Sequence, residues 1–500
     1  MPNSTTKQFK QSLGLLDATM LVSGAMIGSG IFIVSADMAR MLGSTGWLLV
    51  AWVLTGVVTV AAALSYGELE GMMPKAGGKY IYIQRAFGPL TSFVYGWTVF
   101  MVIQTGTIAA VAVAFTKYSA VFFPKLNFQN AENVLFSLGP IDVYAGTFYA
   151  IACIVLLTYI NTQGVNAGKL IQNIFTSTKL VALFGLILIG IGYGLQSGVL
   201  GQNFENAWDA SRVSKETGEV TMISGMALIV ALGVAMISGM ALIVALGVAM
   251  IGSLFSSDAW NNVTFIAAEI KNPKKNIPLS LLLGTLIVTV LYVLANIAYL
   301  CILPLKGSST GADVMAQGIQ FAEYPTDRVA TAAMSVIFGS SSAGIMAVLI
   351  MISTFGCING LILAGARLYY AMAQDGLFLK QASKLNEKSV PGKALWVQCI
   401  WASLLCLSGS YNQLLNYCTF GSLIFYMVTI TGIFVLRRRE PTAERPYKAV
   451  GYPFVPIFYL VVTMGICLIL LSDSNTRFDT GMGLLIAAVG IPVYYITRKS

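Results

Sequence analysis

Long apolar stretches separated by short polar segments dominate the chain. About twelve of them reach the roughly 20 residues that a bilayer-spanning helix needs. They are rich in Leu, Ala, Gly and Met, and they lack the alternation that a membrane β-strand shows. The pattern therefore predicts an all-α membrane protein with twelve transmembrane helices, over residues 14–36, 46–70, 90–121, 142–160, 171–196, 236–268, 277–304, 332–372, 394–409, 413–436, 452–472 and 479–497.

These spans divide the chain into segments. We expect a polar tail over residues 1–13, helices one to five over 14–196, an outer loop over 197–221, helices six to ten over 236–436, a cytoplasmic loop over 437–451, and two last helices with a short tail over 452–500. The loop 73–89 is rich in Gly, Lys and Tyr. We expect it to form a short amphipathic helix at the cytoplasmic surface.

A 14-residue sequence occurs twice in tandem, over residues 222–235 and 236–249. Architectural repeats diverge with time, so an identical copy is either a recent in-frame duplication or a sequence artefact. Both origins stay open, and we assign the duplicate no function. The second copy adjoins the polar segment 253–260, so we expect it to occupy the membrane, while the first copy protrudes outward or displaces the preceding loop.

The charge distribution gives an orientation. The net charge is +9, and with the N-terminus inside, 21 Lys and Arg residues fall on the cytoplasmic side, Lys79 among them, against eight outside. This asymmetry is the positive-inside bias of membrane proteins. It predicts a multi-pass protein of the inner (plasma) membrane, surrounded by lipid, with both termini cytoplasmic and no nucleic-acid partner.

Several kinds of chemistry are missing from the sequence. Histidine is absent, and the seven cysteines stand singly in or beside apolar segments without a C-x-x-C pair. We therefore expect no metal, no cofactor and no enzymatic activity. A channel would need a continuous polar pathway, and the third, fourth, seventh and eleventh spans show no regular polar stripe.

Two predicted spans are interrupted near their middle. The first contains SGAMIGSGIF over residues 23–32, and the sixth contains GSLFSSDAWNN over residues 252–262. Glycine and serine weaken a helix, and matched interruptions in two halves of a transporter mark a binding site at the bilayer midplane. The alternative is that the glycines of the first span only pack against another helix.

An interruption frees backbone groups that lipid cannot satisfy. Free amides from Gly28 to Ile31 favour an anion, helped by the helix dipole. Free carbonyls at the ends of the preceding half-helices favour a cation. An α-amino acid carries a carboxylate and an ammonium on the same carbon, so it satisfies both.

One lysine falls inside a predicted span. Lys179 follows a Thr-Ser-Thr run in the fifth span, and a charge at that depth is costly and is usually functional. Its ammonium can replace a coupling sodium ion or, if desolvated, carry a proton. The alternative is a side chain that extends to the cytoplasmic interface.

These residues carry a family resemblance. The chain resembles the amino acid–polyamine–organocation (APC) superfamily and, within it, the L-type amino acid transporter family. The likeness covers nearly the whole chain in order, through GSGIF (28–32), YGEL (66–69), KAGGKY (75–80), KLVA (179–182), WN (260–261), EIKNP (269–273), YVLANIAY (292–299), FGCING (355–360) and RPYK (445–448).

The resemblance implies a LeuT-like fold, with helices 1–5 and 6–10 as inverted repeats and helices 1 and 6 discontinuous. It implies that Lys179 stands in for sodium with Ser353 as its partner, and that Phe255 is an aromatic gate. The loop after the third span has no cysteine, so no disulfide-linked accessory subunit is expected, and we expect a monomer or weak homo-oligomer. The implied substrate-binding residues are Ile27, Gly28, Ser29, Gly30, Ile31, Gly252, Phe255, Ser256, Ser257 and Asp258.

Asp258 decides between substrate classes. Its carboxylate can pair with a basic substrate side chain, or it can cap the next half-helix through the amides of Asn261 or Asn262. We expect the cap, and hence a sodium-independent permease or antiporter for neutral L-amino acids that works by alternating access. The alternatives are a cationic amino acid or amine exchanger that uses Asp258, and a proton-coupled symporter that uses Lys179.

Overall fold

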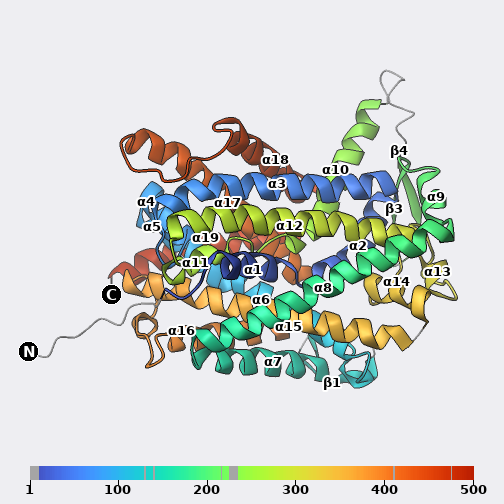
Figure 1. The fold of residues 1–500 in the computed structure, drawn as a ribbon, viewed down its shortest axis with the longest axis horizontal. Coiled ribbons are helices and arrows are strands. Elements are labelled where there is room, and N and C mark those ends of the chain that lie inside the picture. The colour runs from blue at the N-terminus through green and yellow to red at the C-terminus, as the bar shows by residue number, and fades with distance from the viewer. Residues whose placement is uncertain are drawn as a thin grey trace, which may run out of the picture.

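Helices that run roughly side by side build most of the chain (Figure 1). The computed structural model describes residues 11–128, 131–138, 141–215, 217–224, 235–339, 341–408, 411–474 and 476–499. The longer helices are α1 (Leu15–Met26), α2 (Gly30–Leu42), α3 (Thr45–Met72), α4 (Lys79–Phe87), α5 (Pro89–Thr98), α6 (Gln104–Ser119), α7 (Ala145–Thr162), α8 (Val165–Ser197), α10 (Ala235–Ser256), α12 (Pro273–Ile302), α14 (Val329–Phe338), α15 (Ser341–Gln374), α16 (Gly392–Ser408), α17 (Tyr411–Arg439), α18 (Phe454–Ser472) and α19 (Arg477–Lys499).

The predicted membrane class is confirmed. Within the described ranges, nine helices are long and apolar enough to cross a bilayer, or ten if the bent pair α1 and α2 is one span. Residues 240–256 of α10 and 392–407 of α16 form further apolar helical stretches. The predicted count of twelve spans is not confirmed.

Short elements gather at the two ends of the bundle. Helices α4 and α11 (Asn262–Phe265) lie at one end, which we call the α4 end (Figure 1). Strands β3 (Ala210–Val213) and β4 (Val220–Ser224) pair antiparallel at the opposite end, the hairpin end, near α9 (Val199–Phe204) and α13 (Val314–Gln317). Strands β1 (Val134–Leu138) and β2 (Ile141–Tyr144) form a second hairpin. The long loops predicted from sequence thus contain some regular structure.

The second copy of the tandem repeat is helical. Residues 236–249 belong to α10, which extends beyond its neighbours at the hairpin end (Figure 1). Met240 and Ile243 are exposed on it, whereas Val248 and Met250 are buried. Residues 222–224 of the first copy lie in β4, and its residues 225–234 fall outside the described ranges.

The broken pair α1 and α2 occupies the centre of the bundle (Figure 1). Helix α1 packs against α8, α12 and α15, and α2 packs against α10. Most residues from 21 to 36 are buried, so the interruption lies among protein side chains and away from lipid. Backbone outside a helix is tolerated at membrane depth only in such surroundings.

Candidate functional site

The first interruption is a true break in the helix. Helix α1 ends at Met26, α2 begins at Gly30, and the two axes differ by 41°. The Ile27 amide still donates to the Ser23 carbonyl at 2.9 Å, but the Gly28 amide turns back to Met26 at 2.8 Å. Gly30 and Ile31 start a new helix, and the first amides of a helix have no partner within it. They provide the donors that an anion needs.

Side chains from two other helices bind the carbonyls at the end of α1. The Lys179 ammonium, from α8, donates to Gly24 and to Ile27, the latter at 2.7 Å. Ser353 of α15 donates to Ile27 at 3.2 Å and to Gly28 at 3.4 Å. Lys179 is 1% exposed and Ser353 is fully buried. The ammonium therefore lies in the bundle and does not extend to the interface.

The second interruption is at the end of α10. The helix stops at Ser256, and the Asp258 amide donates to Phe255 at 3.2 Å. Ala259 adopts a left-handed φ of 66°, which costs a residue with a Cβ about 1–2 kcal/mol. Helix α11 then begins at Asn262. The predicted break between 252 and 262 thus falls over residues 257–261.

The two interruptions are in contact. The Tyr292 hydroxyl, from α12, donates to Met26 at 3.0 Å and to Ser256 at 3.1 Å, so one side chain ties both helix ends together. A Cβ on Gly30 would lie 2.0 Å from the Ser256 Oγ and 3.0 Å from its Cα. Only glycine permits this approach.

The expected helix cap by Asp258 is wrong. Its carboxylate accepts a hydrogen bond from Ser422 at 2.9 Å and another from Tyr426, both on α17. The N-cap of α11 is Asn261, which makes no side-chain cap bond. The reason is geometric: the left-handed Ala259 turns the chain between Asp258 and α11, so the carboxylate faces α17.

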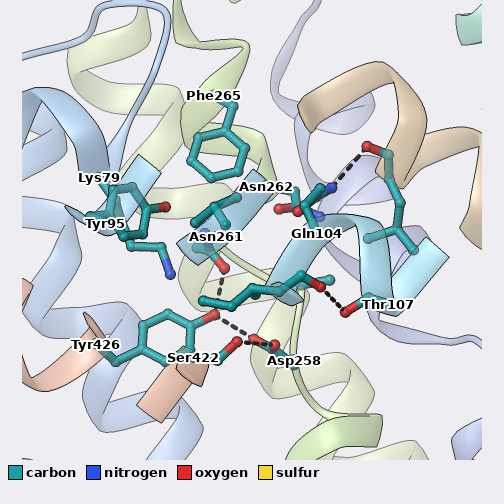
Figure 2. A pocket seen from close by; sticks show the side chains of 14 residues that line it. Lys79, Tyr95, Gln104, Thr107, Asp258, Asn261, Asn262, Phe265, Ser422 and Tyr426 are labelled. Atoms are coloured by element: carbon teal, nitrogen blue, oxygen red, sulfur yellow. Dashed lines mark hydrogen bonds between the residues drawn. The ribbon is translucent and has the colours of Figure 1, made fainter. Parts of the chain in front are cut away.

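Two small cavities, each of about 20 Å³, flank Asp258, Ser422 and Tyr426. A cavity of that size holds about one water molecule. The first lies toward α4, α5 and α6 and is shown in Figure 2. The second lies toward α3 and α18, and its wall includes Ser257 and Trp260.

Lys79 is a cavity residue that the sequence did not single out. It was counted among the Lys and Arg residues of the cytoplasmic side, in a segment expected to form a surface helix, but it is 3% exposed and points into the first cavity (Figure 2). Its Nζ lies 3.7 Å from the centre of the Tyr426 ring. Gly77 and Gly78 before it have left-handed φ values of 105° and 46°. This turn directs α4 inward. The Gly-Gly pair next to Lys79 was the feature of the sequence that could have indicated this turn.

The other predicted site residues divide into two groups. Ser257 and Asp258 line the small cavities, together with Tyr95, Gln104, Asn262 and Tyr426, which the sequence did not single out. Gly252 lines a third, larger cavity near the hairpin end. Phe255 and Ser256 are buried. The residues of the first break that are buried beside the ends of α1 and α2 are Ile27, Gly28, Ser29, Gly30 and Ile31.

Backbone hydrogen bonds and an ion pair connect separate segments at the α4 end. The amide of Leu13 donates to the carbonyl of Glu269 at 3.1 Å, and the amide of Lys271 donates to Leu13 at 2.8 Å. Beneath this contact, Arg367 and Glu269 form an ion pair at 3.1 Å with side chains 0% and 1% exposed. Backbone bonds and a buried ion pair therefore join the segment before α1, the segment around Glu269 and α15 at this end.

The hairpin end holds a cavity of about 150 Å³, whose wall includes Val34, Gly252 and Asp327. Arg40 contacts both carboxylate oxygens of Asp327, at 2.9 and 3.1 Å, and Lys215 joins them. Burial alone would raise the pKa of Asp327, but these two cations outweigh it and hold the pKa below its usual value. Asp327 thus stays charged and links α2 to two loops.

A helical bundle with two discontinuous helices, whose freed backbone groups meet beside small buried cavities, has the architecture of a secondary transporter. Residues 13–492 match the family model described as amino acid permease. The chain belongs to this family. The resemblance to the APC superfamily and its L-type branch is confirmed, and with it the LeuT-like class of fold.

Three relatives illustrate the similarity. The chain is 30% identical over 493 residues to the human large neutral amino acids transporter small subunit 2, covering 97% of this chain and 80% of that protein. It is 27% identical over 464 residues to the mouse b(0,+)-type amino acid transporter 1, covering 92% and 82%. It is 28% identical over 496 residues to the mouse Asc-type amino acid transporter 1, covering 97% and 81%.

Proposed function

We propose that this protein is a sodium-independent transporter that exchanges neutral L-amino acids across the membrane by alternating access. The substrate carboxylate binds the amides at the start of α2, and its ammonium binds carbonyls at the breaks of α1 and α10. The observation that carries the proposal is the Lys179 ammonium on the carbonyls of Gly24 and Ile27. It supplies a fixed positive charge at the place where a metal cation would otherwise be needed.

The two ends of the bundle support alternating access. The contact of Leu13 with Glu269 and the Arg367 pair close the α4 end, while the larger cavity lies at the hairpin end. We propose that substrate enters from the hairpin end in this state. Opening at the α4 end then requires that the Leu13 contact and the buried ion pair separate, while the cluster around Asp327 holds the opposite end.

We propose that the protein acts without a disulfide-linked subunit. One relative carries the words small subunit in its name, but all seven cysteines of this chain are free and buried. A buried thiol cannot reach a cysteine of a partner without unfolding its surroundings. We further propose a plasma-membrane location with both termini cytoplasmic, a monomer or weak homo-oligomer, and passage of the substrate without chemical change.

The second candidate function is exchange of cationic amino acids. It is favoured by one observation, the Asp258 carboxylate on the wall of both small cavities. A proton-coupled symport through Lys179 is a third mode, and it differs from exchange by a requirement for a pH gradient.

Counterflow in proteoliposomes tests the proposal. Vesicles loaded with one unlabelled amino acid, in a panel of twenty, should accumulate the labelled form of a neutral amino acid in choline and sodium buffers alike. An equal initial rate with empty vesicles and a pH gradient would favour symport instead. Absence of counterflow for every amino acid would overturn the proposed function.

A further inference from the structure

A second charged side chain shares the cavity of Asp258. Lys79 reaches it from the first turn of α4, and its ammonium lies 3.7 Å from the ring centre of Tyr426 and 5.6 Å from that of Tyr95. Figure 2 shows the ammonium beside the Tyr426 ring and the Asp258 carboxylate at the hydroxyl of the same tyrosine, and all three residues line the cavity. The described residues provide Lys79 with no hydrogen-bond acceptor.

The carboxylate is better satisfied than the ammonium. Ser422 and Tyr426 each donate to one oxygen of Asp258. Within the described ranges, the Nδ2 of Asn262, on the same cavity, is buried and has no acceptor. The spare groups of the cavity are therefore the Lys79 ammonium, the Asn262 amide and the Tyr95 hydroxyl, two of which can only donate. They suit a substrate side chain that accepts hydrogen bonds or has no charge.

The charge balance indicates what the pair does. Asp258 and a protonated Lys79 sum to zero, so a neutral side chain leaves the enclosed space balanced. A basic side chain adds an uncompensated positive charge in a space from which water is largely excluded, and like charges placed close together there are strongly unfavourable. Without Lys79, the carboxylate would be the uncompensated charge, and a basic side chain would balance it.

We infer that Lys79 is a specificity-determining residue. Its ammonium balances the charge of Asp258, so that the cavity favours amino acids with neutral side chains. The inference rests on the proposed function and names the substrate class of that site. It explains how an acidic residue can line the chamber of a transporter for neutral substrates. Specificity here includes a repulsive element, which is common where similar ligands compete.

The central experiment changes the charge at Lys79 and measures the ratio of L-lysine uptake to neutral amino acid uptake. We would measure initial uptake of labelled L-lysine and of the best neutral amino acid into proteoliposomes holding wild-type protein, Lys79→Gln, Lys79→Arg or the double variant Lys79→Gln/Asp258→Asn. The lysine-to-neutral ratio should rise at least about ten-fold in Lys79→Gln. It should return to the wild-type ratio in the double variant and stay there in Lys79→Arg, which keeps the charge.

The reverse swap is an independent arm. Asp258→Asn keeps an oxygen for Ser422 and Tyr426 but leaves Lys79 without its counter-charge. Because Asp258 holds up the pKa of Lys79, this arm is run at pH 6, where the ammonium is favoured. The ratio of L-glutamate to neutral uptake should then rise, again by about ten-fold, while lysine uptake stays excluded. This arm also decides the case in which Lys79→Gln fails to fold, as judged by gel filtration.

A pH series adds a third reading. Helix α4 lies outside the apolar spans, and burial lowers the pKa of Lys79 to about 7 while Asp258 opposes the shift. Lys79 is therefore charged at pH 6 and largely neutral at pH 8.5; the groups that face it are Asp258, Tyr95 and Tyr426. The lysine-to-neutral ratio of the wild type should increase from pH 6 to pH 8.5, and that of Lys79→Gln should stay flat.

The outcomes distinguish a failure of the proposed function from a failure of the role proposed for Lys79. If the wild type shows no amino acid counterflow, the proposed function fails. If it transports neutral amino acids, but Lys79→Gln keeps the wild-type lysine-to-neutral ratio, or Asp258→Asn keeps the wild-type glutamate-to-neutral ratio, the role of Lys79 is overturned and the proposed function stands.

Discussion

The two helix breaks of this protein differ in what occupies them. At the α1–α2 break, backbone carbonyls are bound by Lys179 and Ser353. At the α10–α11 break, two ionisable side chains, Asp258 and Lys79, line the same cavity. The first break presents peptide groups, and the second presents side-chain chemistry.

The difference corresponds to the two parts of an amino acid. Every L-amino acid has the same carboxylate and ammonium, and peptide groups recognise these without reading the side chain. We propose that the variable part is contacted by side chains of the second break, α4 and α17. Damage to the first break should therefore reduce transport of all substrates equally, whereas changes at the second break should alter which substrates are carried.

The largest effect is expected for Lys179→Ala. The change leaves the buried carbonyls of Gly24 and Ile27 without the ammonium, at a cost of about 1–3 kcal/mol for each unsatisfied group. Uptake should fall by at least about a hundred-fold for every amino acid tested, with the gel-filtration profile of the folded protein retained. Counterflow assays with a neutral and a basic substrate measure the effect.

The matched control is Lys380→Ala, which removes an exposed lysine and should leave transport intact. Freed carbonyls suit a hard cation, so part of the lost activity of Lys179→Ala should return when choline is replaced by sodium. Full transport by Lys179→Ala in choline would remove this lysine from the mechanism.

Gly30→Ala should have the next largest effect. The new Cβ would lie 2.0 Å from the Ser256 Oγ and 2.7 Å from its Cβ, so the two breaks must move apart. A displacement of about 1 Å at a binding site can cost about a hundred-fold in rate, and we expect a ten- to hundred-fold loss shared by all substrates. Initial rates for a neutral panel, with melting temperature in detergent, measure it.

Two variants interpret that result. Gly192→Ala on α8 adds a Cβ that meets nothing within 4 Å, so it should transport like the wild type. The double variant Gly30→Ala/Ser256→Gly relieves most of the clash and should recover part of the rate. A Gly30→Ala protein that loses only some substrates would contradict the division between the two breaks.

Much of the first break was readable from sequence. Three glycines and two serines within residues 23–30 weaken a helix, so the pattern places the break within residues 23–32, and α1 ends there at Met26. Lys179 was also singled out, because a lysine within an apolar span either has a function or extends its side chain to the membrane interface. In both cases a local physical cost marks the residue.

The second break was readable only in part. The sequence located it near Ser257, but it did not show which way Asp258 faces, because that direction depends on the φ of Ala259 and on α17, more than 160 residues away. Lys79 was missed for the same reason. A lysine in a polar loop has no local cost, and only the fold reveals that the Gly-Gly turn points it inward.

The smallest effect tested is that of Ser353→Ala. Its hydroxyl donates to Ile27 and Gly28 at 3.2 and 3.4 Å, but Ile27 keeps its bond to Lys179. One neutral hydrogen bond is worth about 0.5–1.5 kcal/mol, so uptake should fall about two- to ten-fold, by the same factor for each neutral substrate. The neighbouring Thr354 is as buried but bonds only to carbonyls of its own helix, α15, which makes Thr354→Val the matched control.

In a double-mutant cycle of Ser353→Ala with Lys179→Ala, the two losses should not add, because both side chains bind the Ile27 carbonyl. Additive losses would show that Ser353 acts apart from the α1–α2 break.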